Sequence, residues 1–190
     1  VFENKQENMT LRRISEERYE LQRGYAPVIV FTMETFSPRA MMTEMRTLAG
    51  STIRFIHDKQ LRLVSVIDSG GRTYSLEYDN ANRISSIRCV KDPYQNDVDI
   101  FLIGYEYDKR GNLLTQTNMD GSQITYTYTP RNQVATETIS GDGKSYTTSY
   151  SYDKAGNVRF VTDRRGKVTE NRYDEFNRVK EIIYPEGNKE

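Results

Sequence analysis

The sequence predicts an all-β protein in which repeated antiparallel β-hairpins form a meandering, curved β-sheet strip. The first reason is composition: the 190 residues include 14 Tyr and no Trp, and Tyr, Thr, Val and Ile favour half-buried strand surfaces. The second reason is the frequency of Gly, Asn and Asp, which mark the turns between strands. The third is a motif that recurs about every 21 residues, and such a period indicates a repeat architecture.

The repeat is clearest in two stretches, YEYDKRGNLL at 105–114 and YSYDKAGNVR at 150–159. We take the second aromatic residue of each stretch as the anchor of its unit. The equivalent anchors along the chain are Phe36, His57, Tyr78, Tyr107, Tyr128, Tyr152 and Tyr173. The position two residues before the anchor is aromatic or apolar in most units, as at Phe55, Leu76, Tyr105, Tyr126 and Tyr150. Because side chains two residues apart project from the same face of a strand, each pair lays a bulky stripe on one face.

The residues after the anchor predict a tight turn. An Asp follows most anchors, at Asp58, Asp79, Asp108, Asp153 and Asp174. Asp accepts backbone N–H hydrogen bonds, and the fourth turn residue must take a positive φ, which suits Gly111 and Gly156. Other units place Asn there, at Asn82, Asn132 and Asn177. The pattern predicts a three-residue hairpin loop with a G1-type bulge. Leu61 stands in this place in the unit of His57, so we expect another loop geometry there.

A second turn follows each returning strand, as in DSGG (68–71), MDGS (119–122), GDGK (141–144) and DRRG (163–166). One unit is therefore two short strands and two turns, and residues 31–190 hold about seven such units. Residues 1–30 are predicted to form N-terminal strands that resemble the repeat weakly. Within them, 11–24 could form an amphipathic helix, but Tyr19 and Leu21 at spacing two favour a hairpin. Residues 89–99, which contain Pro and Asp, predict a loop insertion.

Charge and hydropathy argue against several classes of protein. The 27 Lys and Arg balance the 27 Asp and Glu, so no net charge attracts nucleic acid. The longest apolar runs, such as 100–104, are far shorter than the roughly 20 residues of a membrane span. Cys89 is the single cysteine, so we expect neither a disulfide framework nor a Cys-based zinc site. The chain opens at Val1 with no visible signal peptide, and we expect it to be a fragment of a longer protein.

No cluster of residues predicts catalysis, a cofactor or a metal ion. GDGKS at 141–145 resembles the end of a phosphate-binding loop, but the required first Gly would fall at Thr138, and a strand follows instead of a helix. His57, the only His, occupies an anchor position and is interpreted as a packing residue. Asp97 and Asp99 lack the pattern of a calcium loop. The turn explains the recurring Asp, so we predict that the chain is not an enzyme.

The units of the form YxYDxxGxL/V resemble the YD repeats of Rhs proteins, which also occur in wall-associated bacterial proteins, insecticidal toxin C components and animal teneurins. The resemblance covers residues 31–190 and rests on structural repeat positions, which are Tyr78, Asp79, Tyr105, Tyr107, Asp108, Gly111, Tyr126, Tyr128, Tyr150, Tyr152, Asp153, Gly156, Tyr173 and Asp174. It implies a wide strip of strands that spirals into a hollow shell and holds a toxic polypeptide. The Asp-Pro at 92–93 lacks the following Gly of the family's self-cleavage motif, so self-cleavage is not carried over.

The resemblance implies a structural function, a shell segment of an Rhs-type polymorphic toxin that encloses a C-terminal toxin before delivery. The implied partners are the rest of the same shell and the enclosed toxin, with no nucleic acid and no cofactor. Exposed edge strands would also permit self-association. The parent protein would be secreted or at the cell surface and would act in competition between bacteria. The alternative function is a cell-surface module whose rows of Tyr bind glycans or a receptor.

Overall fold

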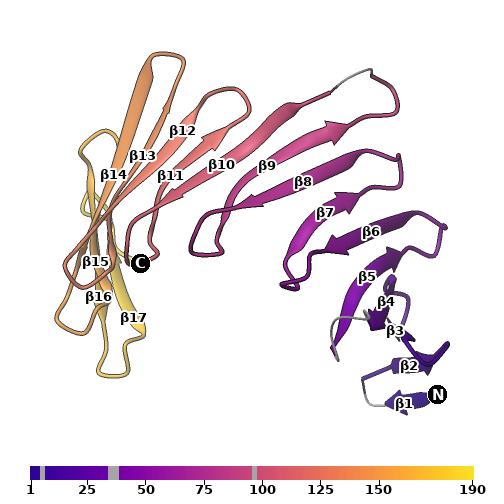
Figure 1. Ribbon diagram of the computed structural model, residues 1–190. Helices are drawn as coiled ribbons and strands as arrows, with labels where there is room; N and C mark the ends of the chain where they lie inside the picture. The colour runs from indigo at the N-terminus through magenta and orange to yellow at the C-terminus, as the bar shows by residue number, and fades with distance from the viewer. Residues whose placement is uncertain (5–6, 34–38, 96–97) are drawn as a thin grey trace. The chain divides into compact units, whose positions relative to one another are not determined.

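The computed structural model describes residues 1–4, 7–33, 39–95 and 98–190, and these form seventeen β-strands and no helix (Figure 1). Successive strands pair antiparallel, each with its neighbours along the chain, so the predicted all-β meander is confirmed. The part of the chain that the structure describes contains no helix with the length and apolar character needed to cross a membrane. The predicted anchor Phe36 and the carboxylate Asp97 lie outside the described residues.

The chain divides into two compact units, Val1–Leu102 and Ile103–Glu190, hereafter unit 1 and unit 2. Unit 1 contains β1 (Phe2–Asn4), β2 (Met9–Arg13), β3 (Arg18–Arg23), β4 (Val28–Met33), β5 (Ala40–Arg46), β6 (Thr52–His57), β7 (Leu63–Ile67), β8 (Thr73–Tyr78) and β9 (Ile84–Lys91). The strand β10 (Ile100–Tyr107) begins at the end of unit 1 and continues into unit 2. Unit 2 then contains β11 (Leu113–Asn118), β12 (Gln123–Tyr128), β13 (Val134–Gly141), β14 (Lys144–Tyr152), β15 (Val158–Thr162), β16 (Val168–Tyr173) and β17 (Val179–Ile183).

Strand pairing decides the secondary structure of two segments, residues 11–24 and the start of the loop expected at 89–99. Residues 11–24 belong to the β2–β3 hairpin, in which Leu11 pairs with Leu21, so the helical alternative is wrong. The loop expected at 89–99 begins later than predicted, because Lys91 still pairs with Thr73 at the end of β9. The strand β9, paired with β8, therefore extends three residues into the expected loop, from Cys89 to Lys91. The division of the chain at residue 30 stays a prediction.

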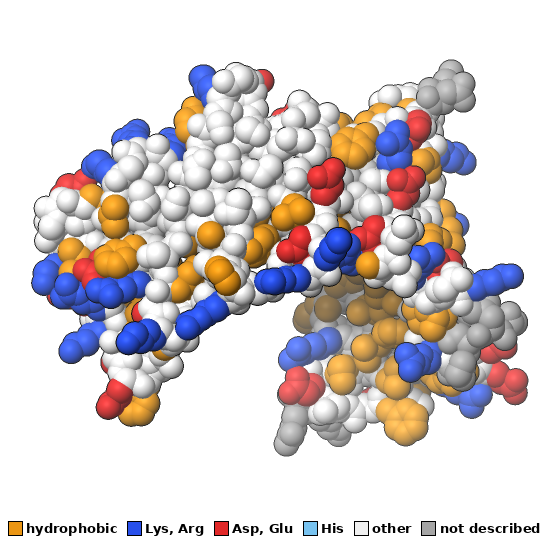
Figure 2. Space-filling view, turned by 60° about the vertical axis from the view of Figure 1, so that its left-hand side comes forward, with side chains coloured by type: hydrophobic (Ala, Val, Ile, Leu, Met, Phe, Trp, Pro, Cys, Tyr) orange, Lys and Arg blue, Asp and Glu red, His pale blue; other side chains and the backbone are white. Residues whose placement is uncertain are grey.

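Among the residues that the structure describes, the sheet forms no hydrophobic core of the usual two-layer kind. Among the described apolar residues, only Val30 and Cys89 are buried, at 1% and 5% exposure. Figure 2 accordingly shows hydrophobic side chains at the surface, between charged ones. Neighbouring side chains on the same face cover one another in part, and such cross-strand pairs are the unit of stabilisation in a sheet. Hydrogen bonds and cross-strand pairs must therefore supply most of the stability.

The two faces of unit 2 differ in chemistry. The register places one set of residues on a face that we call the tyrosine face, which includes Tyr105, Tyr107, Tyr126, Tyr128, Tyr150, Tyr152 and Tyr173. The opposite face, which we call the hydroxyl face, carries Thr115, Thr125, Thr127, Thr136, Thr138, Thr147 and Ser149. Its hydroxyl groups bond to one another across strands, at 2.6 Å for Thr127 and Thr136. Between β11 and β14 this face is polar and uncharged, and charged residues such as Glu106, Glu170 and Arg172 lie on it towards the two ends of unit 2.

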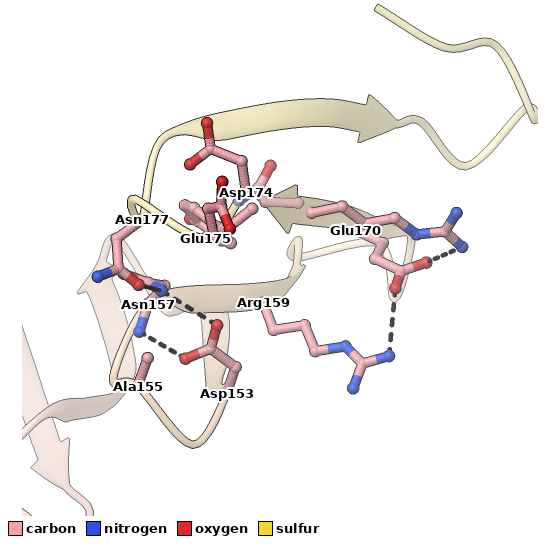
Figure 3. Close-up of a pocket in the computed structure, with 11 residues that line it drawn as sticks. Asp153, Ala155, Asn157, Arg159, Glu170, Asp174, Glu175 and Asn177 are labelled. Carbon is pink, nitrogen blue, oxygen red and sulfur yellow. Dashed lines mark hydrogen bonds and ion pairs between the residues drawn. The ribbon is translucent and has the colours of Figure 1, made fainter.

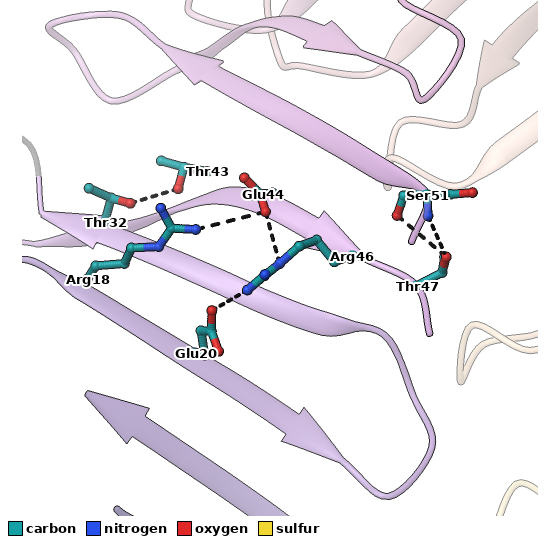
Figure 4. A network of polar contacts seen from close by, with 8 residues as sticks. All are labelled: Arg18, Glu20, Thr32, Thr43, Glu44, Arg46, Thr47 and Ser51. Atoms are coloured by element: carbon teal, nitrogen blue, oxygen red, sulfur yellow. Dashed lines mark hydrogen bonds and ion pairs between the residues drawn. The ribbon is translucent and has the colours of Figure 1, made fainter. Parts of the chain in front are cut away.

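Val30 is buried in unit 1 by charged neighbours, without a second layer of the sheet. It pairs with Glu20 on β3 and with Glu44 on β5. Arg46 forms ion pairs with both glutamates, and Arg18 lies 3.9 Å from Glu44 (Figure 4). Long charged side chains can cover apolar surface with their stems while their charged ends stay in water. This network accounts for the one fully buried aliphatic side chain among the described residues.

Candidate functional site along the Tyr-Asp turns

The turns that follow the anchors share one backbone geometry. In the turn of Asp108, its N–H donates to the carbonyl of Asn112 at 2.9 Å, and the N–H of Gly111 donates back to the carbonyl of Asp108 at 3.1 Å. The same pair of bonds closes the turns that begin at Asp58, Asp79, Thr129, Asp153 and Asp174. Gly111 and Gly156 have φ values of +93° and +95°, as the turn prediction requires. We call this row of turns the Tyr-Asp edge.

The Asp carboxylate holds the inside of each turn. In the turn of Asp108, Oδ1 accepts the N–H groups of Arg110 and Asn112 at 2.8 and 2.9 Å, and Oδ2 accepts the Asn112 side-chain amide at 2.8 Å. The side-chain amide of Asn112, above the other contacts, lowers the pKa of Asp108. The backbone N–H of Asn157, followed by its side-chain amide, likewise lowers the pKa of Asp153. These carboxylates accept the turn hydrogen bonds in their ionised form, so they are poorly suited to general acid-base chemistry.

The turn at Leu61 corrects an expectation from the sequence. We expected a different loop there, but Leu61 adopts a φ of +65° and donates its N–H to the carbonyl of Asp58 at 2.9 Å, as Gly and Asn do in the other turns. The strand pairs on both sides of the turn, with His57 opposite Leu63, hold the backbone in the shared geometry. The unit therefore imposes the left-handed conformation on a residue that disfavours it.

The hydroxyl group of the anchor tyrosine joins one hairpin to the next. It donates to the carbonyl of the first residue of the returning strand in the preceding unit, at 2.7 to 2.8 Å: Tyr78 to Leu63, Tyr128 to Leu113, Tyr152 to Val134 and Tyr173 to Val158. Backbone pairing between β11 and β12 runs only from Thr115 to Thr117 on the β11 side, so the Leu113 carbonyl lies beyond the ladder. The phenol supplies the bond that this carbonyl needs.

Sequence reasoning assigned these tyrosines a packing role and missed the hydroxyl bond. A signal was present, because the anchor is Tyr, and not Phe, from Tyr78 to Tyr173. Phe would supply the same ring to the stripe but could not donate a hydrogen bond. The acceptor lies 15 to 18 residues earlier in the chain, which local patterns do not reveal.

A second set of bonds runs from turn to turn along the Tyr-Asp edge. The residue that ends one turn donates to the next turn, about 20 residues on: Arg62 to Asn82 at 2.8 Å, Asn112 to Asn132 at 2.6 Å, Gln133 to the Gly156 carbonyl at 3.1 Å, and Asn157 to Asn177 at 2.9 Å. The Arg62 guanidinium also lies 4.8 Å from the centre of the Tyr78 ring. Asn82, Asn132 and Asn177 therefore have two roles: each adopts the positive φ of its own turn, and each accepts the hydrogen bond from the preceding turn.

The opposite edge of the strip carries the second turns. Most repeat the geometry of the Tyr-Asp turns, with Gly at the positive φ: Gly50, Gly71, Gly121, Gly166 and Gly187. The β13–β14 hairpin differs, since Gly141 pairs with Lys144 and both loop residues, Asp142 and Gly143, have positive φ. This is the two-residue loop that Asp-Gly favours. GDGKS therefore forms a hairpin tip, which agrees with the interpretation that it is not a phosphate-binding loop.

An open groove of about 500 Å³ lies between neighbouring Tyr-Asp turns of unit 2 (Figure 3). Inside it, Glu170 forms ion pairs with Arg159 at 3.3 Å and Arg172 at 3.2 Å, and Asp153 is held by Asn157. Among the residues that the structure describes, no three His, Cys, Asp or Glu side chains lie where they could hold a metal ion. The geometry of this groove serves to brace adjacent hairpins.

Acid is expected to weaken the fold through the turn carboxylates. Their pKa values are lower in the folded chain than the ordinary value of about 3.9, so their contribution to stability is complete above that value and is lost as the pH falls through the folded pKa. We expect the urea midpoint, followed by circular dichroism, to stay constant from pH 7 to about pH 5 and to fall below about pH 4.

Asp153→Asn tests whether this acid response comes from the turns. The variant has no carboxyl group at this position, whereas the parent protonates its Asp153 carboxylate in acid. The stability of the variant relative to the parent should therefore be lowest at neutral pH, and the difference should shrink as the pH drops below about 4. A midpoint that stays level down to pH 2, or a deficit that does not change with pH, would contradict the role of these carboxylates.

The geometry of the strands and turns defines a class of protein. A one-layer array of antiparallel hairpins, closed by Asp-led turns and joined by tyrosine hydroxyl groups, is a β-hairpin repeat protein. The RHS repeat family model matches residues 57–92, 107–145 and 152–189, which is more than half of the chain, and the chain belongs to the RHS repeat family. No curated protein matches the sequence.

Solved structures show the same fold. The crystal structure of TcdB2-TccC3-Cdc42 matches with a TM-score of 0.65 and 12% identity, over 92% of this chain and 12% of that chain. TcdB2-TccC3 without its hypervariable C-terminal region matches with a TM-score of 0.65 and 14% identity, over 87% and 9% of the two chains. The Tc holotoxin pore of Photorhabdus luminescens with a TccC3 mutation matches with a TM-score of 0.65 and 13% identity, over 92% and 12%. The chain thus spans only a small part of the proteins it matches.

Proposed function

We propose that this chain is a wall segment of an RHS-type shell that encloses a toxic polypeptide and keeps it inert before delivery. The observation that carries this proposal is the one-layer sheet, in which only Val30 and Cys89 of the described apolar residues are buried. A globular domain of this size would bury a core of its own. A panel with two accessible faces suits a wall, because one face can meet solvent and the other can meet contents.

The links along the Tyr-Asp edge explain how such a wall can be stable without a second layer of sheet. In unit 2, each hairpin is tied to the next by a backbone ladder, by a tyrosine hydroxyl bond and by a bond between turns. Stability in repeat arrays is a sum of unit and nearest-neighbour terms, so it grows with the number of hairpins instead of with a central core. The fold that 92% of the chain shares with part of TcdB2-TccC3-Cdc42 supports this function.

The proposed role requires no chemistry from this segment. The turn carboxylates are engaged by backbone N–H groups, and the only His occupies an anchor position on β6. The partners that we propose are the other hairpins of the same shell and the enclosed polypeptide. The proposal also places the parent protein outside the cytoplasm at some stage, as a secreted or surface effector used against competing bacteria.

The test uses the parent polypeptide that contains this segment, purified uncleaved. Limited proteolysis and electron microscopy should show a closed particle that includes residues 31–190 and a protease-resistant polypeptide inside it. An open sheet with no enclosed polypeptide would refute the shell. Titration of that sheet with soluble glycans would then test the alternative of a surface recognition module, and turnover of ester, peptide or phosphate substrates would overturn the non-catalytic role.

A further inference from the structure

The tyrosine face of unit 2 is its more apolar face, and no described strand of unit 2 forms a layer over it. Besides its tyrosines it carries aliphatic side chains such as Leu113, Ile124, Val134 and Val161. In Ile103–Glu190, Gly104 is the only buried residue, so every one of these side chains keeps part of its surface accessible. A contiguous apolar surface of this kind marks a site of contact with another molecule.

One carboxylate stands in the middle of this face. Glu137 on β13 pairs directly with Tyr126 on β12, and on its other side lies Thr148 of β14, two residues from Tyr150 on the same face. The other charged residue of the strands β10 to β15 on this face is Lys144, at the distant tip of the β13–β14 hairpin. Glu137 is half-buried, and its carboxylate makes no hydrogen bond or ion pair with any residue that the structure describes.

An unpaired, half-buried carboxylate is unusual in this molecule. On the opposite face and in the turns, carboxylates of similar exposure have cationic or N–H partners, as Glu170 has Arg159 and Arg172. Burial among neighbouring side chains, and secondarily the charge of Glu137, raises the pKa of Tyr126 and Tyr150. Partly buried charges are stabilised when a partner compensates them, so a cationic partner would stabilise Glu137.

We propose that the tyrosine face of unit 2 binds an extended polypeptide segment and takes one of its Lys or Arg side chains onto Glu137, between Tyr126 and Tyr150. The carboxylate supplies the counter-charge. The two phenol rings supply cation–π contacts and an apolar bed for the stem of the cationic side chain. The backbone of the segment can bond to tyrosine hydroxyl groups, since Tyr126 donates to no described residue.

The occupant is a peptide and not another sheet, because the face alternates apolar and hydrogen-bonding groups over several strands. This inference rests on the proposed function and deepens it, since it assigns the tyrosine face to the contents of the shell. The hydroxyl face, whose Thr side chains already bond to one another at 2.6 Å for Thr127 and Thr136 and at 2.9 Å for Thr138 and Thr147, is left to solvent.

The test measures binding of two labelled, unstructured peptides to the 190-residue chain by fluorescence anisotropy. One peptide repeats Gly-Ser-Lys and the other repeats Gly-Ser-Glu. The Lys peptide should bind, the Glu peptide should not, and added salt should weaken the binding. Glu137→Gln should lower the affinity for the Lys peptide by about fivefold, which corresponds to about 1 kcal/mol.

Glu106→Gln is the matched control, because it makes the same change of charge on the opposite face, where Glu106 pairs with Thr115. It should leave the affinity unchanged, and circular dichroism should show that both variants fold. Tyr126→Leu gives a second variant that should also weaken the Lys peptide. Equal effects of Glu137→Gln and Glu106→Gln, no binding of the Lys peptide, or equal binding of the Glu peptide would each overturn the proposal.

The two proposals fail separately. Enclosed polypeptide in the parent particle, with no peptide binding through Glu137, would refute the assigned face and leave the shell intact. Peptide binding through Glu137 in a parent protein that encloses nothing would refute the shell and leave the tyrosine face as a peptide-binding surface.

Discussion

Replacing Tyr78, Tyr128, Tyr152 and Tyr173 together by Phe is expected to lower the free energy of unfolding by about 4 kcal/mol, or about 1 kcal/mol for each lost hydrogen bond. Each replacement keeps the ring but removes a hydroxyl group that donates to a carbonyl beyond the end of the backbone ladder. Urea unfolding followed by circular dichroism measures the loss. Because no two of these bonds share a residue, the single variants should together account for most of the combined effect.

Tyr126→Phe is the control for this series. Tyr126 lies on the same face and on the same strand as Tyr128, but its hydroxyl group donates to no residue that the structure describes. The variant removes a phenol oxygen of equal chemistry and should change the stability by less than about 0.5 kcal/mol. If Tyr126→Phe and Tyr128→Phe cost the same, the hydroxyl bonds between hairpins do not stabilise the array.

Replacing Gly111 and Gly156 together by Val is expected to lower the free energy of unfolding by about 2–4 kcal/mol, or about 1–2 kcal/mol for each turn. Both residues have a φ above +90°, a conformation that a β-branched residue strongly disfavours. At Gly156 an added Cβ would also come within 3.3 Å of the Gln133 side-chain nitrogen, which donates to the Gly156 carbonyl. The midpoint of urea unfolding measures the change.

Leu61→Asn should act in the opposite direction. Leu61 has a φ of +65° in the same turn geometry, and Asn tolerates this conformation better, so the variant should raise the free energy of unfolding by about 1 kcal/mol. Unchanged stability in Gly111→Val and Gly156→Val would refute the assignment of strain to these positions. A loss of stability in Leu61→Asn would show that the packing of the Leu side chain outweighs the strain of its backbone.

Much of the fold could be predicted because its information is local. The aromatic residues at spacing two place a stripe on one strand face, and Asp followed by Gly or Asn three residues later specifies the turn. Asp108 with Gly111 and Asp153 with Gly156 occupy the expected places. The prediction was wrong at Leu61, where the intrinsic preference of the residue opposes the turn but the strand pairs on both sides impose it.

The links between hairpins could not be predicted, because each joins residues far apart in the sequence. Tyr128 reaches a carbonyl 15 residues earlier, and Asn112 reaches an amide 20 residues later. A tyrosine on a strand is explained equally well by packing, so the sequence alone gives no reason to assign its hydroxyl group a partner. Only the arrangement of neighbouring strands shows which carbonyl lies beyond the ladder and within reach.

The sequence alone therefore specifies the repeat, the strands, the turns and the family, since all of these depend on residues within one unit of about 21 residues. Tertiary structure decides the burial and the pairing across units. Within the described strands of unit 2, it shows no second layer over the tyrosine face and no cationic side chain paired with Glu137 beside Tyr126. Exposure and charge compensation depend on neighbours from other strands. The strand register determines those neighbours, because a shift of one residue would move every side chain of a strand to the opposite face.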